Sequence, residues 1–293
     1  MCGRFANGLS AHELYHIVDD VLADESLTAH DNAFEYHPTY NVAPGSMYPV
    51  VHATDSKQGA SVMLETMKWG VRRDADARGV LQINARDDTI LRRPWPCHTK
   101  RCLVFCQGFF EWRVLPGPGR SKRIAHFVGL SEPGRGRPTA EGSSRQLMPM
   151  AGLYTEDRGQ RAFTIVTTAA NAQLRFLHDR MPVILATEQL MCQWLYATDT
   201  QPLTSLLRPY AGHLDCYAVP PEVGPVGYSC RALIEPVASR RDGIEAFLGK
   251  RTTPTQPKRS DAPVQRRVKR PAASPAPTPK KARGTPSLED FWN

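Results

Sequence analysis

The sequence lacks any long hydrophobic run. Hydrophobic residues make up 41% of its 293 residues, which is enough for a sizeable core, but no stretch approaches the 18 or so apolar residues that span a bilayer. The first residues also lack the apolar segment of a secretory signal. We therefore expect a protein that folds around its own core and has no membrane partner.

Cysteine is scarce, with seven residues that follow no disulfide framework, and this favours a reducing compartment. Four of the potential metal ligands, Cys97, His98, Cys102 and Cys106, lie within ten positions. Zinc sites usually repeat a close cysteine pair further along the chain, and no second pair is present. On a strand, Cys102 and Cys106 would share a face with Val104, so we interpret them as buried apolar residues and predict no metal.

Two common enzyme signatures are also missing. The sequence has no glycine-rich phosphate loop and no Gly-x-Ser-x-Gly motif. The basic stretch GPGRSKR does not have the spacing that cradles a nucleotide. We therefore expect no bound cofactor.

Acidic residues are outnumbered, with 29 Asp and Glu against 37 Lys and Arg, and the excess is localised. Residues 251–293 hold ten Lys or Arg and three Asp or Glu, so this segment carries +7 of the net charge of +8. It also holds eight of the 25 prolines and few apolar residues. Such a composition cannot fold alone, so we predict a folded domain over 1–250 and a disordered basic tail over 251–293.

The folded part has a mixed pattern with more strands than helices. The stretch SAHELYHIVDDVL predicts an amphipathic helix that Ser10 and Glu13 begin with a capping box, and TEQLMCQWLY predicts another with Thr187 as its N-cap. Strands are predicted at MYPVVHA, ASVMLETMKWGV, RCLVFCQGFFEW, QLMPMAGLY and AFTIVTTAA, and a short helical run at NAQLRFLH. Residues 115–145 are predicted to be a surface insertion with a short strand at IAHFVGL. The expected fold is α+β: a curved, barrel-like antiparallel or mixed sheet with peripheral helices.

Polar residues interrupt apolar strands at four places. Asn84 and Arg86 in INARDD would share one face of a strand, although a strand that ends in a loop explains them as well. Glu111 lies among aromatic residues in CQGFFEWR, where apolar surroundings would raise its pKa and suit it to proton transfer; an edge strand facing water is the alternative. Thr167 in TIVTTAAN and His178 in LHDRMPVIL, each taken alone, are better explained by a structural role.

Cys2 raises a separate question. Because the side chain of Cys is small, the initiator Met1 is a substrate for aminopeptidases, and its removal would leave Cys2 with a free α-amine beside its thiol. A terminal cysteine of this kind is a potential nucleophile, but its reactivity depends on its surroundings.

Together, MCGRFA, YNVAPG, MKWGV, INARDD, GFFEW, AGLY, TIVTTAAN and HDRMPVIL stand in the same order as in the SOS response-associated peptidase (SRAP) family, which the chain resembles over residues 2–235. GFFEW stands where GFYEW is common, and the following insertion is longer. With its basic tail the chain is more similar to the eukaryotic members, the abasic-site processing and 5-hydroxymethylcytosine-binding type, than to the compact bacterial ones.

The resemblance implies an enzyme that senses abasic sites in single-stranded DNA and cross-links to them covalently, through a thiazolidine formed by Cys2. It implies Cys2, Asn84, Glu111 and His178 as catalytic residues, and Arg4, Trp69, Arg86, Thr167 and Arg180 as DNA-binding residues. Among these, Trp69 is expected to stack on a base. Peptidase or lyase activity is expected with it. Two rival functions stay open: an amidohydrolase with an N-terminal nucleophile, and a non-enzymatic reader of modified DNA.

The tail carries two further motifs. VKRPAASPAPTPKKAR has two basic clusters around a Pro/Ala-rich spacer and resembles a bipartite nuclear localisation signal, so we expect a nuclear protein. TPSLEDFW resembles a sliding-clamp (PCNA) interaction box, in which Leu288, Phe291 and Trp292 fit the hydrophobic spacing although Thr285 replaces the usual Gln. We expect the protein itself to be a monomer.

Overall fold

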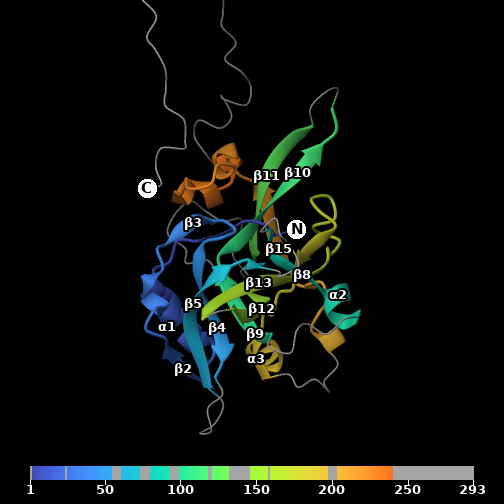
Figure 1. The fold of residues 1–293 in the computed structure, drawn as a ribbon. Helices are drawn as coiled ribbons and strands as arrows, with labels where there is room; N and C mark the ends of the chain where they lie inside the picture. The colour runs from blue at the N-terminus through green and yellow to red at the C-terminus, as the bar shows by residue number, and fades with distance from the viewer. Residues whose placement is uncertain are drawn as a thin grey trace, which may run out of the picture. The chain divides into compact units, whose positions relative to one another are not determined.

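A computed structural model describes residues 2–23, 25–54, 61–72, 80–92, 99–117, 121–131, 146–157, 159–196 and 203–239 (Figure 1). The predicted domain boundary near residue 250, the nuclear localisation signal and the clamp-binding residues lie outside the described residues. No helix in the described ranges is long and apolar enough to cross a membrane.

The first sheet has five antiparallel strands in the order β15-β11-β10-β1-β3 (Figure 1). Their bounds are β15 Leu214–Ala218, β11 Lys122–Leu130, β10 Gly108–Leu115, β1 Phe5–Asn7 and β3 Thr39–Val42. The short N-terminal strand β1 therefore lies between two longer segments from elsewhere in the sequence.

The second sheet has the order β14-β13-β12-β9-β4-β5-β2, with β8 also paired to β13. Their bounds are β14 Arg180–Pro182, β13 Gln160–Ala169, β12 Met148–Asp157, β9 Lys100–Cys106, β4 Met47–Ala53, β5 Ser61–Trp69, β2 Ser26–Ala29 and β8 Asn84–Arg86. A parallel pairing between β5 and β13 closes five of these strands into a ring. Strands β6 (Val71–Arg72) and β7 (Leu81–Gln82) form a small separate pair.

Short helices accompany the sheets. The α-helices are α1 Ala11–Val21, α2 Asp87–Arg92 and α3 Glu188–Tyr196, and 3-10 turns occur at Ala33–Glu35, Leu203–Ser205, Pro221–Val223, Arg231–Ile234 and Val237–Ser239. The predicted capping box is confirmed, because the Glu13 amide donates to Ser10 Oγ and the Ser10 amide donates to Glu13 Oε2. Thr187 Oγ1 accepts from the Leu190 amide, as predicted. The α+β fold class is confirmed.

The predicted strand over residues 101–112 is two strands that belong to different sheets. Strand β9 ends at Cys106 in the ring, and β10 begins at Gly108 in the five-stranded sheet. Gly108 has a φ of 151°, and a Cβ atom there would lie 2.4 Å from the Val128 carbonyl oxygen, so only glycine fits. The Gln107 amide donates to Ala6 O at 2.8 Å, which fastens the bend to β1.

Two other predictions are wrong. The strand expected at IAHFVGL is present as part of β11, but it does not belong to a surface insertion, because β11 is an inner strand of the first sheet and its last six residues are buried. The expected helical run at 171–178 forms hydrogen-bonded turns instead of a helix. In the last of these turns the His178 amide donates a hydrogen bond to the Leu174 carbonyl oxygen at 3.1 Å. In both places contacts with distant strands override the local pattern.

Alternation along β9 divides the core. Cys102, Val104 and Cys106 point into the cluster that also holds Cys2, while Leu103 and Phe105 point into the cluster that packs under α1 and α3. The prediction that the two β9 cysteines are buried apolar residues is therefore confirmed.

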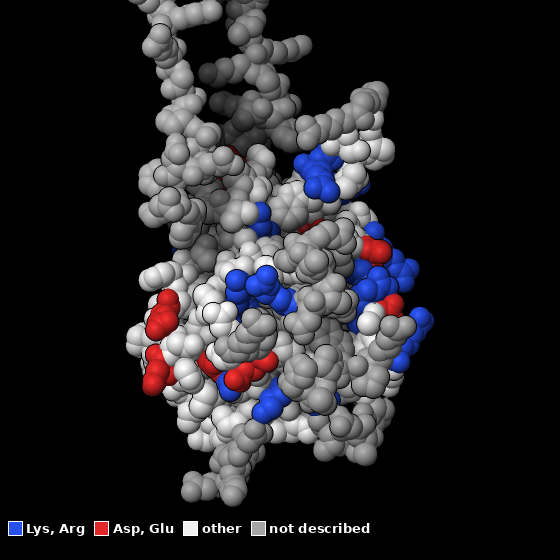
Figure 2. Space-filling view, in the orientation of Figure 1, with Lys and Arg blue, Asp and Glu red and all other residues white. Residues whose placement is uncertain are grey.

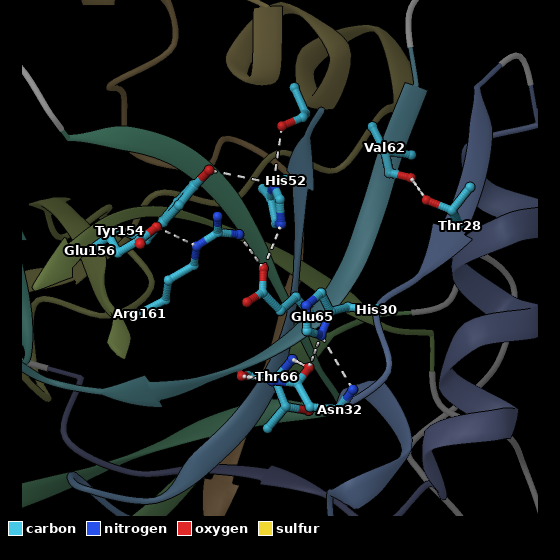
Figure 3. A network of polar contacts seen from close by, with 11 residues as sticks. Thr28, His30, Asn32, His52, Val62, Glu65, Thr66, Tyr154, Glu156 and Arg161 are labelled. Carbon is cyan, nitrogen blue, oxygen red and sulfur yellow. Dashed lines mark hydrogen bonds and ion pairs between the residues drawn. The ribbon is translucent and has the colours of Figure 1, made fainter. Parts of the chain in front are cut away.

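A polar network joins four strands of the ring (Figure 3). Buried Glu65 on β5 accepts from His52 Nε2 on β4 at 3.0 Å and from Arg161 Nη1 on β13 at 2.6 Å. Tyr154 Oη on β12 lies 3.4 Å from His52 Nδ1, and Glu156 accepts from Arg161 Nε at 3.0 Å. Burial alone would raise the Glu65 pKa, but the His52 and Arg161 hydrogen bonds and the Arg161 charge outweigh it and lower this pKa.

This network predicts a pH-dependent contribution to stability. Because the Glu65 pKa is lowered in the fold, its carboxylate stabilises the protein above the unfolded pKa of about 4.3, and this contribution disappears as the pH falls through the folded value. Glu65→Gln should lower the free energy of unfolding at pH 7 by about 1–3 kcal/mol, below the range for a fully buried pair because Arg161 is partly exposed. Urea unfolding at pH 7 and below pH 4 measures the difference. Glu156→Gln, at the exposed end of the network, is the control, with an expected change under about 0.5 kcal/mol; a Glu65→Gln loss independent of pH would contradict the assignment.

Candidate functional site

Cys2 lies in the core at the start of β1. Its side chain is 1% exposed and its thiol faces the Arg4 carbonyl oxygen at 3.9 Å. Burial raises the pKa of the Cys2 thiol well above its usual range, and the neighbouring Cys106 and Glu111 raise it further. The thiol is therefore un-ionised at neutral pH in this conformation.

Asn84 reaches Cys2 from the second sheet. Parallel pairing with Ile165 of β13 fixes the start of β8, and from there Asn84 Nδ2 donates to the Cys2 carbonyl oxygen at 2.9 Å. The Asn84 Oδ1 atom is buried and has no hydrogen-bond partner among the described residues. An unpaired amide oxygen next to Cys2 can accept a hydrogen bond from a donor group that arrives there.

Glu111 approaches Cys2 from the first sheet. It follows Phe109 and Phe110 on β10, it is buried, and its Oε1 accepts from the Trp112 amide at 3.3 Å. Its charge acts on the Cys2 thiol, which places the two groups in one electrostatic environment. Because Glu111 is buried on an inner strand of the first sheet, the alternative of an edge strand facing water is wrong.

His178 ends the 171–178 turns, directly before β14. Its Nδ1 atom lies 3.0 Å from the Arg180 amide nitrogen and 2.6 Å from Asp179 Oδ1. The amide requires a lone pair on Nδ1, whereas the ion pair requires a proton there, so the contacts belong to the neutral and the protonated ring respectively. The two contacts hold the ring in one place directly before β14.

The three predicted DNA-binding arginines are engaged in contacts within the chain. Arg4 donates to Asn41 and to the carbonyl groups of residues 223 and 224. Arg180 Nη2 pairs with Asp87 at 2.6 Å, and Arg86 forms a two-bond pair with Asp88. Figure 2 shows basic side chains with acidic ones among them at the edge of the view where Figure 1 places α2, and another basic group over the outer ends of β10 and β11.

Trp69 and Thr167 do not reach the surface. The Trp69 side chain is 0% exposed, stacks on Phe163 and donates to the Ile83 carbonyl oxygen at 3.1 Å. A base cannot contact this ring in the described conformation, so the structure does not support the expected stacking role. Thr167 is also buried, and its hydroxyl group contacts Arg180. Both Trp69 and Thr167 therefore lie in the core.

The sequence patterns missed Phe176 and His126. His126 stands opposite Glu111 across the β10–β11 pair, and its ring contacts the edge of Phe176. Arg113, two residues after Glu111, lies over the Phe176 ring at 5.4 Å. The alternation of Glu111 and Arg113 along one strand was a usable signal for Arg113, but Phe176 comes from a turn that no local pattern connects to β10.

Comparisons with known proteins identify the family of the chain. Residues 1–226 match the family model described as SOS response associated peptidase (SRAP), and the chain therefore belongs to this family. It is 32% identical over 237 residues to the abasic site processing protein YoqW of Bacillus subtilis (strain 168), covering 75% of this chain and 92% of the relative. The abasic site processing protein YMR114C of Saccharomyces cerevisiae is 26% identical over 274 residues, covering 81% and 68%. The abasic site processing protein HMCES of Gallus gallus is 28% identical over 199 residues, covering 59% of each chain.

Two solved structures share the fold. A protein from Bacteroides thetaiotaomicron matches with a TM-score of 0.60 and 22% identity, over 80% of this chain and 99% of the other. A phage-related protein from Bordetella bronchiseptica matches with a TM-score of 0.53 and 24% identity, over 78% and 99%. At these identities the likeness establishes the fold alone.

The two arginine pairs predict different consequences of losing a carboxylate. The Arg180 and Asp87 side chains are 9% and 17% exposed, whereas Arg86 and Asp88 are 50% and 39% exposed. Asp87→Asn leaves a buried guanidinium without its counter-charge and should lower the free energy of unfolding by about 2–4 kcal/mol. Asp88→Asn, the matched control, should leave the free energy of unfolding nearly unchanged, because exposed ion pairs contribute little. Denaturant unfolding measures both, and equal losses would show that Asp87 does not support Arg180.

Proposed function

We propose that the chain senses abasic sites in single-stranded DNA and forms a covalent cross-link to them through Cys2, after removal of Met1. The observation that carries the proposal is the convergence on Cys2 of Asn84 from one sheet and Glu111 from the other. Relatives described as abasic site processing proteins support the substrate class.

The chemistry follows from what an N-terminal cysteine offers. The α-amine adds to the aldehyde carbon of the ring-opened deoxyribose, and loss of water leaves a Schiff base. The Cys2 sulfur then adds to the same carbon, its proton passes to the nitrogen, and a five-membered thiazolidine closes. The second addition is intramolecular, which favours it strongly over attack by an external thiol.

The surroundings of Cys2 support amine attack as the first step. Its thiol is un-ionised because burial and the Glu111 charge raise its pKa, so it is a weak nucleophile before the Schiff base forms. An N-terminal α-amine has an ordinary pKa of about 7.7–8.0, so a substantial part of it is neutral near pH 7.5. With Met1 attached this nitrogen is an amide and cannot add to an aldehyde.

Each neighbour of Cys2 has a definable part in this scheme. Glu111 takes and returns protons as the carbinolamine forms and loses water, and it accepts the proton that the thiol releases. His178 donates a proton to the ring oxygen of the sugar and so promotes opening. Asn84 holds the Cys2 carbonyl group through Nδ2 and orients the α-amine through its unpaired Oδ1.

The flanking DNA is held by cations around the site. Arg86 lies at the surface, and exchange of its Asp88 partner for a phosphate would cost little because exposed ion pairs are weak. Arg4 and Arg180 are proposed to act mainly by shaping the site, since both already have partners in the chain. The same proposal has further parts. The protein is a monomer of the eukaryotic type, resides in the nucleus and binds a sliding clamp through the basic tail. It also has peptidase or lyase activity.

The central prediction concerns Cys2. Purified protein mixed with single-stranded DNA that bears one abasic site should give a slowly migrating adduct on a denaturing gel. Cys2→Ser should abolish the stable adduct, because a hydroxyl group closes a far less stable ring than a thiol does. Cys102→Ser is unsuitable as a control because that residue is buried in the core, so partly exposed Cys230→Ser serves instead and should cross-link like the wild type.

Two outcomes would contradict the proposal. An adduct that survives in Cys2→Ser would move the covalent centre to another residue. A complete lack of adduct, with N-terminal sequencing that confirms an exposed Cys2, would favour the amidohydrolase or the non-enzymatic reader.

A second prediction separates chemistry from binding at Glu111. Glu111→Gln keeps the shape of the side chain but removes its proton exchange, so the cross-linking rate at saturating protein should fall about 100-fold or more. The Kd for DNA with a non-reactive abasic analogue should change less than about threefold. Single-turnover gels and fluorescence anisotropy measure the two quantities, and a parallel loss of both would refute the assigned role.

A further inference from the structure

One face of the β10–β11 hairpin continues outward from the proposed reacting centre. Glu111, Arg113 and Leu115 alternate onto this face of β10, and their partners across the pair are His126, Ile124 and Lys122. Phe109 and Val128, on the same face, pack in the core cluster that contains Cys2. The face therefore runs from the buried neighbours of Cys2 to the exposed cations Arg113 and Lys122.

Phe176 lies over this face and stays accessible. Its side chain is 50% exposed, its edge meets the His126 ring at a centroid distance of 5.9 Å and 75°, and the Arg113 guanidinium lies over it at 5.4 Å. The two contacts hold an aromatic ring at the surface in a defined orientation. Phe176 also comes two residues before His178, so the ring lies beside the residue assigned to opening of the sugar.

The charge around Phe176 favours a polyanion. Exposed Arg175 precedes it, and Arg113 and Lys122 follow along the hairpin, while Glu111 is the sole acidic residue within β10 and β11. Burial lowers the pKa of His126, so its ring is neutral at physiological pH and does not repel Arg113. Figure 2 shows basic side chains over the outer ends of these two strands. An aromatic ring beside a line of cations is the arrangement that binds single-stranded nucleic acid.

We propose that Phe176 stacks on the nucleobase next to the abasic site and that Arg113 and Lys122 bind the phosphates beyond it. This inference rests on the proposed function and names the contact that holds the flanking strand. It also fills the role that the sequence assigned to Trp69, which is buried. Stacking on an aromatic ring tolerates any base, so the contact confers affinity for single-stranded DNA without sequence preference.

The test measures affinity separately from chemistry. The probe is fluorescent single-stranded DNA with a central tetrahydrofuran, an abasic analogue that has no aldehyde and cannot cross-link. Phe176→Ala should raise its Kd about 5- to 100-fold, and Phe176→Trp should restore it. Arg113→Ala should weaken binding. It should also reduce the slope of log K against log salt concentration by close to one, because one fewer counterion is released. Phe34→Ala is the matched control, because Phe34 is 42% exposed and stacks on His12, and its variant should bind like the wild type.

Cross-linking of reactive abasic DNA completes the design. At limiting protein, the loss of cross-linking in Phe176→Ala should follow its loss of affinity. An unchanged Kd would overturn the inference, and a lower rate at saturating protein with an unchanged Kd would show that Phe176 positions His178 instead. If the wild type cross-links while these variants bind normally, only the stacking contact is wrong. If the wild type does not cross-link to abasic DNA, the proposed function is wrong, and the inference about Phe176 that rests on it is wrong too.

Discussion

The bend at Gln107 and Gly108 is the constraint on which the site depends. It directs one continuous apolar segment into two sheets, and it is fastened to β1 by the Gln107 amide and by Gln107 Oε1, which accepts from the Gly8 amide at 2.8 Å. The same bend pairs β10 with β1 through Phe109 and Phe5. Cys2, at the start of the chain, is thereby fixed against Glu111, so a terminal residue that would ordinarily fray becomes part of the core.

The second sheet supplies Asn84, which contacts Cys2. Closure of the ring by β5 and β13 leaves the end of β13 free to pair with β8, and this pairing brings Asn84 to Cys2. Asp87 then binds both Arg180 and Thr168, which ties the chain after β8 to β13 and β14. The residues proposed as catalytic on three separate segments therefore come together because of sheet pairing.

Much of this arrangement could be predicted from the sequence, and the failures have physical reasons. The capping box of α1, the buried β9 cysteines and the burial of Glu111 follow from short-range periodicity, which local patterns record well. The break after Cys106 was missed because Gln107 and Gly108 interrupt the run for only two residues, with strand-forming residues on both sides. Trp69 was expected to stack on a base because its motif, and not its surroundings, suggested that role. Phe176 was missed because its partners His126 and Arg113 lie 50 and 63 positions earlier in the chain, on β11 and β10.

The most direct test of the account is the mass of the N-terminal peptide recovered from the DNA adduct after nuclease and protease digestion. The account predicts a peptide that begins at Cys2, carries the deoxyribose carbon skeleton with the loss of one water, and has neither a free amine for acylation nor a free thiol for alkylation. A peptide that retains Met1 and still carries the sugar, or a sugar attached to a lysine elsewhere, would contradict it.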